Sequence, residues 1–486
     1  MPDFLLNLDG SGRAPRDVQV QALTWLTREW DNYRVFALNM PTGSGKSMVA
    51  RAIQIATGAP IITSSNLLLD QYTREYRMNY VKGRDHYTSP YGLSCDTACP
   101  IVVGDKACPG CPYKIARAKA LAEEPTVYNP ASLFYLSGGK VPGAARVVDE
   151  ADLLSDFAKM LCSFSFSKSK YGWTDKQLSE LELEAWLTDL LRRLEKLART
   201  HLTAGNTKEY SKVSKDLDRI RQTRTAFCQA PEQFAIWKEK KRSRGRMEEY
   251  LNLQPILPPK HFRDAVLGEG KVILMSGTLF EPDIKELVPG EEYGYVSLAS
   301  PIPVERRPVL YRPIAESVSY QTPPETIAKA IEEVVQTYPE QNMLVHLSYS
   351  DTRSVGDLLR VPYITHTKGT KSAVLKQFKQ DGGVLLAAGC AVGIDLPDSL
   401  CRVIYIPRLL KPNLGDPAVK KRKALEDGQT WYDFQVIKTA VQALGRGARH
   451  EKDFCLGIVG DPSFARLVLK YYEKLPKSIT EAIQWA

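Results

Sequence analysis

The sequence predicts an α/β fold, in which parallel sheets are flanked by helices. Short apolar runs alternate with stretches of helical composition on both sides of a segment that has a different pattern. A glycine-rich loop at residues 41–47 connects the first apolar run to a helical stretch, and a later run ends in acidic residues at 149–152. Ligands of parallel sheets bind at the carboxyl ends of the strands, so we expect the loop and the acids to share one site.

Length, composition and termini define the broad class of protein. The 486 residues correspond to about three domains at a prior of ~150 residues each. A net charge of +9 permits a polyanionic partner without identifying one. The N-terminus lacks a signal-peptide pattern, and no apolar run reaches the ~20 residues that a bilayer requires. Nine cysteines then point to a reducing compartment. We expect a cytoplasmic, nucleoid or nuclear protein that is neither secreted nor membrane-bound.

Two α/β units can be distinguished along the chain. In the first we expect strands at 34–40, 61–65 and 145–152, and a helix over Ser47–Thr57. The second unit occupies roughly residues 300–486. Its strand-like runs are NMLVHLSYS (342–350), GGVLLAAG (382–389), CRVIYIP (401–407) and FCLGIVGD (454–461).

Between the two units, residues 175–227 have the pattern of a helical hairpin. One apolar stripe at helical spacing consists of Leu178, Leu181, Leu187, Leu190, Leu194 and Leu197. A second stripe consists of Tyr210, Val213, Leu217, Ile220 and Phe227. Gly205 and Asn206 predict the turn between the helices, and a basic run at 238–246 follows them.

The segment NMPTGSGKS at 39–47 has the features of a phosphate-binding loop. Gly43 and Gly45 allow backbone N–H groups to turn toward phosphates, where a β-carbon would obstruct them. Lys46 supplies charge for the β- and γ-phosphates, and Ser47 supplies a hydroxyl for Mg²⁺. Met40 replaces the usual first glycine, but that position belongs to the incoming strand. The expected ATP-binding residues of the loop are Thr42, Gly43, Ser44, Gly45, Lys46 and Ser47.

Adjacent carboxylates, Asp149 and Glu150, end a strand about 100 residues after the loop lysine. We expect Asp149 to hold Mg²⁺ through water and Glu150 to polarise the water that attacks the γ-phosphate. Further short motifs follow in a fixed order. They are Arg16 and Gln19; Ser276, Gly277 and Thr278; Gly393 and Asp395; and Gln442, Arg446 and Arg449. This series resembles that of superfamily 2 helicases, and the resemblance implies that Arg16 and Gln19 read adenine.

The last motif has a mechanical meaning. We expect Arg446 and Arg449 to lie three residues apart on a helix of a second lobe, close to Gln442. Arginine fingers of this kind reach the γ-phosphate when two lobes close, and they raise the rate by roughly 10³–10⁵. Closure therefore couples hydrolysis to relative motion of the lobes.

Four cysteines cluster between the loop and the acids. Cys95, Cys99, Cys108 and Cys111 have the spacing C-x3-C-x8-C-x2-C. Four thiolates hold either a tetrahedral zinc or a [4Fe–4S] cluster, and the spacing alone does not choose between them.

The motifs, the cysteines and the helical hairpin together resemble the iron–sulfur superfamily 2 helicases of the XPD/DinG type. The resemblance implies two RecA-like motor domains, with an Fe–S insert and a helical arch insert in the first, and it favours [4Fe–4S] over zinc. It also implies an ATP-dependent DNA helicase, able to work as a monomer, that moves 5′→3′ on single-stranded DNA and unwinds forked DNA in repair or replication. Asp152 replaces the usual histidine of the family, so its coupling role stays open.

The domain boundaries implied by the resemblance are 1–84, 121–167 and 251–297 for the first motor domain, 85–120 for the cluster domain, 168–250 for the arch and 298–486 for the second motor domain. Candidate phosphate contacts are Lys106, Lys114, Arg117, Lys119 and the run 238–246. Candidate faces for base stacking are Tyr87, Tyr91 and Tyr113, each worth ~1–3 kcal/mol if used.

Three other functions are less consistent with the sequence. A DEAD-box-like RNA helicase with a structural zinc shares D-E-A-D at 149–152 but needs neither a four-cysteine insert nor an arch. A zinc-stapled nucleic-acid-binding protein with a vestigial nucleotide site is disfavoured by the intact set of nucleotide-site residues Lys46, Asp149, Glu150, Arg446 and Arg449. A nuclease lacks support, because no separate cluster of carboxylates or histidines is evident in the sequence.

Overall fold

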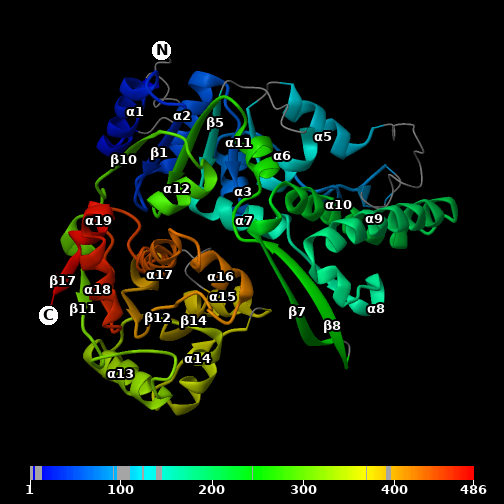
Figure 1. Cartoon of the computed structure of the whole chain (residues 1–486). Coiled ribbons are helices and arrows are strands. Elements are labelled where there is room, and N and C mark those ends of the chain that lie inside the picture. Colours follow the sequence, from blue (N-terminus) through cyan, green and yellow to red (C-terminus); the bar gives the residue numbers. More distant parts are fainter. Residues whose placement is uncertain are drawn as a thin grey trace.

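A computed structural model gives the architecture. It describes residues 4–5, 14–90, 92, 94–95, 110–122, 125–137, 145–243, 245–367, 369–389 and 396–485. Two parallel sheets with helices on their faces form two lobes, and an arm of helices and antiparallel strands projects from the first (Figure 1). The predicted α/β fold with two parallel sheets is confirmed. No helix in the described residues is both long and apolar enough to cross a membrane.

The sheet of the first lobe has the strand order β10-β1-β9-β5-β2-β4-β3, and every neighbouring pair is parallel. Its strands are β1 (Val35–Asn39), β2 (Ile61–Thr63), β3 (Asn79–Val81), β4 (Thr126–Tyr128), β5 (Ala145–Asp149), β9 (Lys271–Ser276) and β10 (Tyr293–Ser297). All residues of β1 and β5 are buried, which explains their continuous apolar sequences. The strands expected at 34–40, 61–65 and 145–152 are confirmed.

Helices cover both faces of this sheet. They are α1 (Asp17–Glu29), α2 (Lys46–Thr57), α3 (Asn66–Glu75), α5 (Pro112–Leu121), α6 (Pro130–Ser137), α7 (Leu154–Leu161), α11 (Lys260–Leu267) and α12 (Glu281–Leu287). Side chains of α1, α2 and α3 form one apolar core, and those of α6, α7, α11 and α12 contribute to another. Packing of helices on both faces therefore supports the strand ends that carry the site.

The sheet of the second lobe has the order β13-β14-β12-β15-β16-β11-β17 and is also parallel. Its strands are β11 (Val309–Tyr311), β12 (Met343–Leu347), β13 (Ile364–Thr365), β14 (Val384–Ala388), β15 (Val403–Ile406), β16 (Leu456–Val459) and β17 (Ile483–Trp485). Its helices are α13 (Pro324–Thr337), α14 (Tyr349–Ser354), α15 (Lys371–Asp381), α16 (Pro417–Lys423), α17 (Gly428–Leu444), α18 (Ser463–Lys470) and α19 (Lys477–Thr480). The four expected runs are confirmed as β12, β14, β15 and β16.

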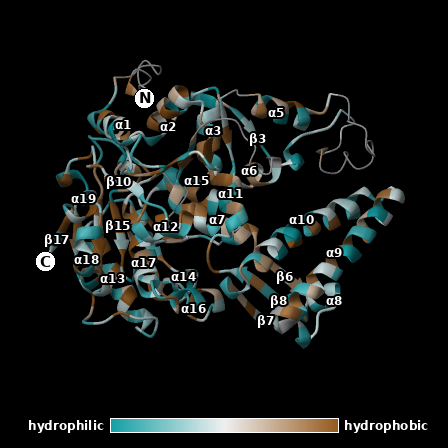
Figure 2. Cartoon of the chain, turned by 45° about the horizontal axis from the view of Figure 1, so that its top comes forward, coloured by the Kyte–Doolittle hydropathy of each residue, from teal (hydrophilic) through white to brown (hydrophobic). Residues whose placement is uncertain are grey.

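The projecting arm contains the expected helical hairpin, α9 (Glu180–Thr203) and α10 (Thr207–Gln229), with Gly205 at φ +71° in the turn. Hydrophilic and hydrophobic colours alternate along both helices, as expected where one face is buried (Figure 2). The leucine stripe was partly wrong. Leu187, Leu190 and Leu194 are buried, but Leu181 is 82% exposed and Leu197 is 42% exposed.

An antiparallel sheet in the arm was not predicted. It has the order β6-β8-β7 and joins β6 (Phe164–Ser167), β7 (Phe234–Ser243) and β8 (Arg246–Pro255), next to the short helix α8 (Lys168–Tyr171). The described residues of the basic run 238–246 thus belong to the outer part of β7 and the start of β8, with Gly245 in the turn between them. The implied arch is not purely helical, and its expected boundary at residue 250 falls within β8. The domain boundaries themselves stay predictions.

Candidate active site

A cleft between the two lobes contains most of the predicted site residues. Its cavity of about 530 Å³ is lined by side chains of both lobes. The predicted residues in its lining are Arg16, Thr42, Gly43, Gly45, Lys46, Ser47, Asp149, Glu150, Ser276, Gly277, Thr278, Gln442, Arg446 and Arg449. Residues more than 400 positions apart in the sequence therefore face one space.

The phosphate-binding loop has the backbone that its glycines predict. Gly43 and Gly45 adopt φ values of +80° and +79°, and α2 begins directly after Gly45. A β-carbon on Gly45 would lie 2.1 Å from Nε2 of Gln19, and one on Gly43 would lie 2.7 Å from the carbonyl oxygen of Arg449. Met40 is fully buried, and its N–H donates to the Ser276 carbonyl at 2.8 Å. Met40 thus packs at the strand end and leaves the loop intact.

Arg16 and Gln19 brace this loop from helix α1. The Arg16 guanidinium donates to the Gly43 carbonyl, and Gln19 Nε2 donates to the Gly45 carbonyl at 3.3 Å. Gln19 Oε1 accepts from the Arg16 N–H at 2.9 Å, and Gln19 is 1% exposed. These contacts place both residues beside the loop, while the reading of adenine stays a prediction.

Lys46 is held inside the loop. Its Nζ donates to the carbonyl oxygens of Met40 at 3.1 Å and Pro41 at 3.3 Å. Burial lowers the pKa of Lys46, and the carboxylates Asp149 and Glu150 oppose that shift. A phosphate in the loop would offer the buried ammonium an anionic acceptor in place of these neutral carbonyls.

Asp149 ends strand β5 and is 1% exposed. Its Oδ2 accepts from the Tyr72 hydroxyl at 2.7 Å, and its Oδ1 accepts from the Glu150 N–H at 3.1 Å. Burial raises the pKa of Asp149, whereas Lys46 and Tyr72 lower it. Tyr72, on α3, fixes the carboxylate, and sequence reasoning missed it because a tyrosine on a helix carries no motif.

Glu150 occupies an unusual backbone conformation at the cleft. Its φ of +59° lies in the left-handed region, where non-glycine residues are strained. Its Oε2 is buried and has no hydrogen-bond partner in the described part of the chain. Burial raises the pKa of Glu150 to about 7, Asp149 and Asp152 act in the same direction, and Lys46 and Arg446 oppose them. A pKa near neutrality suits a general base.

Asp152 connects the two lobes. Its Oδ2 accepts from the Thr278 hydroxyl at 2.6 Å and from Gln442 Nε2 at 2.8 Å. Gln442 Nε2 also lies 3.2 Å from the Thr278 hydroxyl oxygen. Asp152 therefore contacts both a first-lobe motif and the second-lobe helix α17.

The second lobe brings Arg446 and Arg449 to the cleft. Helix α17 ends at Leu444, so the prediction that both arginines lie on a helix was wrong. Arg446 lies in the turn that follows the helix, and Arg449 lies in the irregular segment after that turn. Arg446 Nε donates to the Gln442 carbonyl at 3.1 Å. Arg446 lies near enough to Glu150 to lower the pKa of its carboxyl group. Arg449 likewise lies near enough to Lys46 to lower the pKa of its ammonium group.

Two buried ion pairs join α12 of the first lobe to the second lobe. Asp283 pairs with Lys438, which lies one helical turn before Gln442 on α17, and Glu286 accepts from Arg422 of α16 at 2.9 Å. Lys438 Nζ also lies 3.4 Å from the Asp152 carbonyl oxygen. Burial raises the pKa of Asp283 to about 6, and Lys438 opposes the shift. The pair is therefore charged at neutral pH.

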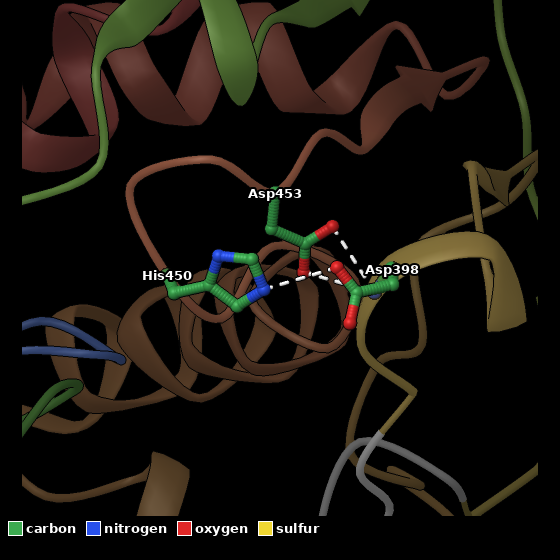
Figure 3. Close-up of side chains that lie close together, drawn as sticks. All are labelled: Asp398, His450 and Asp453. Carbon is green, nitrogen blue, oxygen red and sulfur yellow. Dashed lines mark hydrogen bonds and ion pairs between the residues drawn. The ribbon is translucent and has the colours of Figure 1, made fainter.

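A further cluster lies behind Arg449. Asp398, His450 and Asp453 point toward one another (Figure 3), the one grouping with metal-ligand geometry in the described residues. The sequence had shown no such cluster. Asp453 is fully buried and accepts from the Arg449 N–H at 2.9 Å, the Asp398 N–H at 3.1 Å and Arg402 at 3.0 Å. Because the carboxylate oxygens of Asp453 already accept these hydrogen bonds, we interpret the cluster as a structural support that fixes the position of Arg449.

Two of the four predicted cysteine ligands lie within the described residues. Cys95 and Cys111 are buried, and their sulfur atoms lie 3.9 Å apart. Cys99 and Cys108 lie outside the described residues. A tetrahedral zinc with bonds of ~2.3 Å has a sulfur–sulfur edge of about 3.8 Å, whereas a [4Fe–4S] cluster holds its thiolates on separate irons, farther apart. The two thiols converge as a metal–thiolate site requires, and as they stand they fit zinc more closely.

The remaining candidate residues are mostly peripheral. Tyr87 and Tyr113 pack edge to face at 5.7 Å, and Lys114 and Lys119 are exposed on α5. Arg117 is half-buried. Gly393, Asp395, Tyr91 and Lys106 lie outside the described residues.

Comparisons with known proteins agree with this geometry. Residues 331–482 match the model of the helicase C-terminal domain family. A solved structure titled XPD_Helicase covers 97% of this chain and all of its own, with a TM-score of 0.64 and 16% identity. This chain has the XPD helicase fold. The Xpd4 structure of S. tokodaii also covers 97% of this chain and all of its own, with a TM-score of 0.55 and 16% identity.

A curated relative adds sequence evidence for the same resemblance. The Fanconi anemia group J protein homolog of Gallus gallus is 30% identical over 116 residues, which cover 21% of this chain and 9% of that protein. The chain thus matches a small part of this relative's length. Taken with the family model and the solved structures, this match confirms the resemblance to helicases of the XPD/DinG type.

Proposed function

We propose that this protein is an ATP-dependent DNA helicase that moves along single-stranded DNA, with 5′→3′ movement following from the resemblance. The observation that carries the proposal is the cleft, where Lys46, Asp149 and Glu150 face Gln442, Arg446 and Arg449 of the other lobe. In a vestigial nucleotide site, no function would maintain the strained backbone of Glu150 opposite Arg446 and Arg449 of the other lobe.

The residues of the cleft divide the chemistry of phosphoryl transfer. The loop N–H groups and Lys46 bind the phosphates of ATP, and Glu150 takes a proton from the attacking water. Ser47 and Asp149 would hold Mg²⁺, which adds positive charge at the phosphates. Arg446 and Arg449 stabilise charge that develops on the γ-phosphate. Contacts of Asp152 with Thr278 and Gln442 transmit the state of this site to the second lobe.

Strand displacement tests the proposal. Forked duplexes with a 5′ or a 3′ single-stranded tail, in DNA or RNA, are incubated with the intact chain and Mg-ATP. We expect DNA displacement from the 5′-tailed substrate and none with Lys46→Ala. Displacement of RNA alone would favour the RNA helicase. Binding of DNA without displacement or ATP hydrolysis would favour the nucleic-acid-binding protein.

We further propose that Cys95, Cys99, Cys108 and Cys111 bind a [4Fe–4S] cluster, on the strength of the resemblance. Zinc is the second candidate, favoured by the 3.9 Å separation of the Cys95 and Cys111 sulfurs. Metal and sulfide analysis of protein purified without air decides between them. About four irons and four sulfides per chain, with colour lost in Cys108→Ser, support the cluster. One zinc per chain and no colour would establish the alternative.

Removal of either partner of the buried pair of Asp283 and Lys438 should destabilise the contact between the lobes. Replacing either residue alone leaves an uncompensated buried charge, which typically costs about 3–5 kcal/mol. We expect Asp283→Asn and Lys438→Met each to lower the free energy of unfolding, and the double variant to lower it by less than the sum. Urea unfolding of the four proteins measures this difference.

The exposed pair of Lys260 and Asp264 on α11, 2.6 Å apart, is the matched control. Removing it should change the free energy of unfolding by about 0.5 kcal/mol or less. Additive effects of Asp283→Asn and Lys438→Met would contradict the assigned coupling. For the same single variants we expect kcat for ATP to fall more than its KM rises, because α17 also positions Gln442.

A further inference from the structure

The β7–β8 hairpin forms a long basic ribbon at the side of the molecule (Figure 1). Ten residue pairs join its strands, from Phe234 opposite Pro255 to Ser243 opposite Arg246. Strand β6 pairs only with residues 250–253 of β8, so the outer part of the ribbon is two-stranded. At ~3.3 Å per residue, its ten-residue strands extend for about 33 Å.

The charge of the ribbon is concentrated at its tip. Residues 242–246 read RSRGR and include no acid. Farther in, acids neutralise the lysines: Lys238 pairs with Asp175 at 3.0 Å, Lys240 with Glu249 at 3.4 Å and Lys241 with Glu239 at 2.8 Å. Arg242 and Arg246 are exposed and have no acidic partner in the described residues. Side chains of both charges would be enough to protect an exposed sheet edge from aggregation. A tip that carries only positive charge therefore indicates a further role for that charge.

Both faces of the ribbon are basic. In the pairing register Arg242 is opposite Met247, whereas Arg246 is opposite Ser243, and side chains of successive residues alternate between faces. Arg242 and Arg246 therefore lie on opposite faces. A single flat anionic surface would meet only one of them, but a groove between two phosphate backbones would meet both.

The tip also lacks the residues that bind single strands. Single-stranded nucleic acid is usually held by aromatic faces on which bases stack. Residues 238–249 contain no aromatic side chain. The major groove of B-DNA, about 12 Å wide, admits a two-stranded β-ribbon.

The base of the ribbon is attached to the second lobe. Lys421 Nζ on α16 donates to the Phe234 carbonyl at 2.6 Å, and Ala418 packs against Ala235 and Ile256. The same helix carries Arg422, the buried partner of Glu286. Helix α16 is thus wedged between the ribbon and α12, and the ribbon is held against both lobes.

We propose that the tip of the β7–β8 hairpin, through Arg242 and Arg246, contacts the phosphate backbones of the duplex arm of a forked DNA. This inference rests on the proposed function, because it assumes a DNA fork as the substrate. It assigns the duplex to the ribbon and leaves the single strand to other parts of the molecule.

Fluorescence anisotropy of the full chain with labelled forked DNA, and with a single strand matching one tail, tests the assignment. Each phosphate contact adds about 0.9 to the slope of log K against log salt. Arg242→Gln/Arg246→Gln should flatten the slope for the fork by about 1.8 and weaken fork binding roughly tenfold or more at 0.1 M salt. Binding of the single strand and its stimulation of ATP hydrolysis should stay unchanged.

The control variant Arg28→Gln/Lys329→Gln removes the same charge from exposed positions elsewhere and should leave the fork slope unaltered. Arg242→Lys/Arg246→Lys should restore most of it. An unchanged slope in Arg242→Gln/Arg246→Gln would overturn the proposal, as would equal losses on fork and single strand. If the wild-type chain bound no DNA and hydrolysed no ATP, the proposed function itself would fail, which is a separate result.

Discussion

Replacing Arg446 by alanine is expected to slow ATP hydrolysis by roughly 10³–10⁵-fold, the range found for arginine fingers elsewhere. The physical reason is position. Arg446 is supplied by the second lobe, lines the cleft opposite the phosphate loop, and lies near enough to Glu150 to lower its pKa. Its charge is therefore available where the transition state gains negative charge. Steady-state hydrolysis at saturating ATP and single-stranded DNA measures the loss.

Nucleotide binding separates this effect from misfolding. Lys46 and the loop N–H groups belong to the first lobe, so Arg446→Ala should bind a fluorescent ATP analogue with nearly unchanged affinity. Arg466→Ala, on the exposed surface of α18, is the matched control and should hydrolyse ATP normally. Arg446→Lys should recover little, because lysine lacks the planar fork of donors. A loss below tenfold in Arg446→Ala would remove the residue from the catalytic machinery.

Glu150→Gln should produce the second large loss, roughly 10²–10⁴-fold in hydrolysis, since a general base contributes about that much. The amide keeps the size of the side chain but cannot accept the proton of water. ATP binding should persist. Glu269→Gln, an identical change at an exposed position before β9, is the control.

The pH dependence gives an independent test of the same residue. Burial raises the pKa of Glu150 to about 7. The base acts only when deprotonated, so kcat/KM for ATP should fall about tenfold per pH unit below 7 and level off above it. The residual activity of Glu150→Gln should lack this slope. A wild-type profile that is flat between pH 5 and 8 would exclude Glu150 as the titrating base.

Much of the fold and the nucleotide site could be predicted because local patterns determine them. Strands such as β1 and β5 are buried on both faces, so their continuous apolar sequences stand out. Gly43, Gly45 and Lys46 act through a spacing that is visible in the sequence. Short strands such as β3 and β13 contain too few residues to show any period.

The missed features depend on contacts between distant residues. Asp283 and Lys438 are 155 residues apart, and either alone looks like a surface charge. The outer part of the β7–β8 ribbon buries little, so it has no alternation of apolar residues. The helix that was expected to include Arg446 ends at Leu444, and glycines at 445 and 447 stand on either side of Arg446. A β-carbon on Gly447 would lie 2.1 Å from the Cys455 sulfur. That close approach appears only in the folded chain.

The central claim is that the two lobes form one nucleotide-hydrolysing site controlled by DNA. It is tested most directly by measuring ATP hydrolysis of the purified chain with and without single-stranded DNA, beside Lys46→Ala. We predict hydrolysis that requires Mg²⁺, rises with DNA and disappears in the variant. Hydrolysis that is absent in the wild type under both conditions, or equal in wild type and Lys46→Ala, would contradict the account.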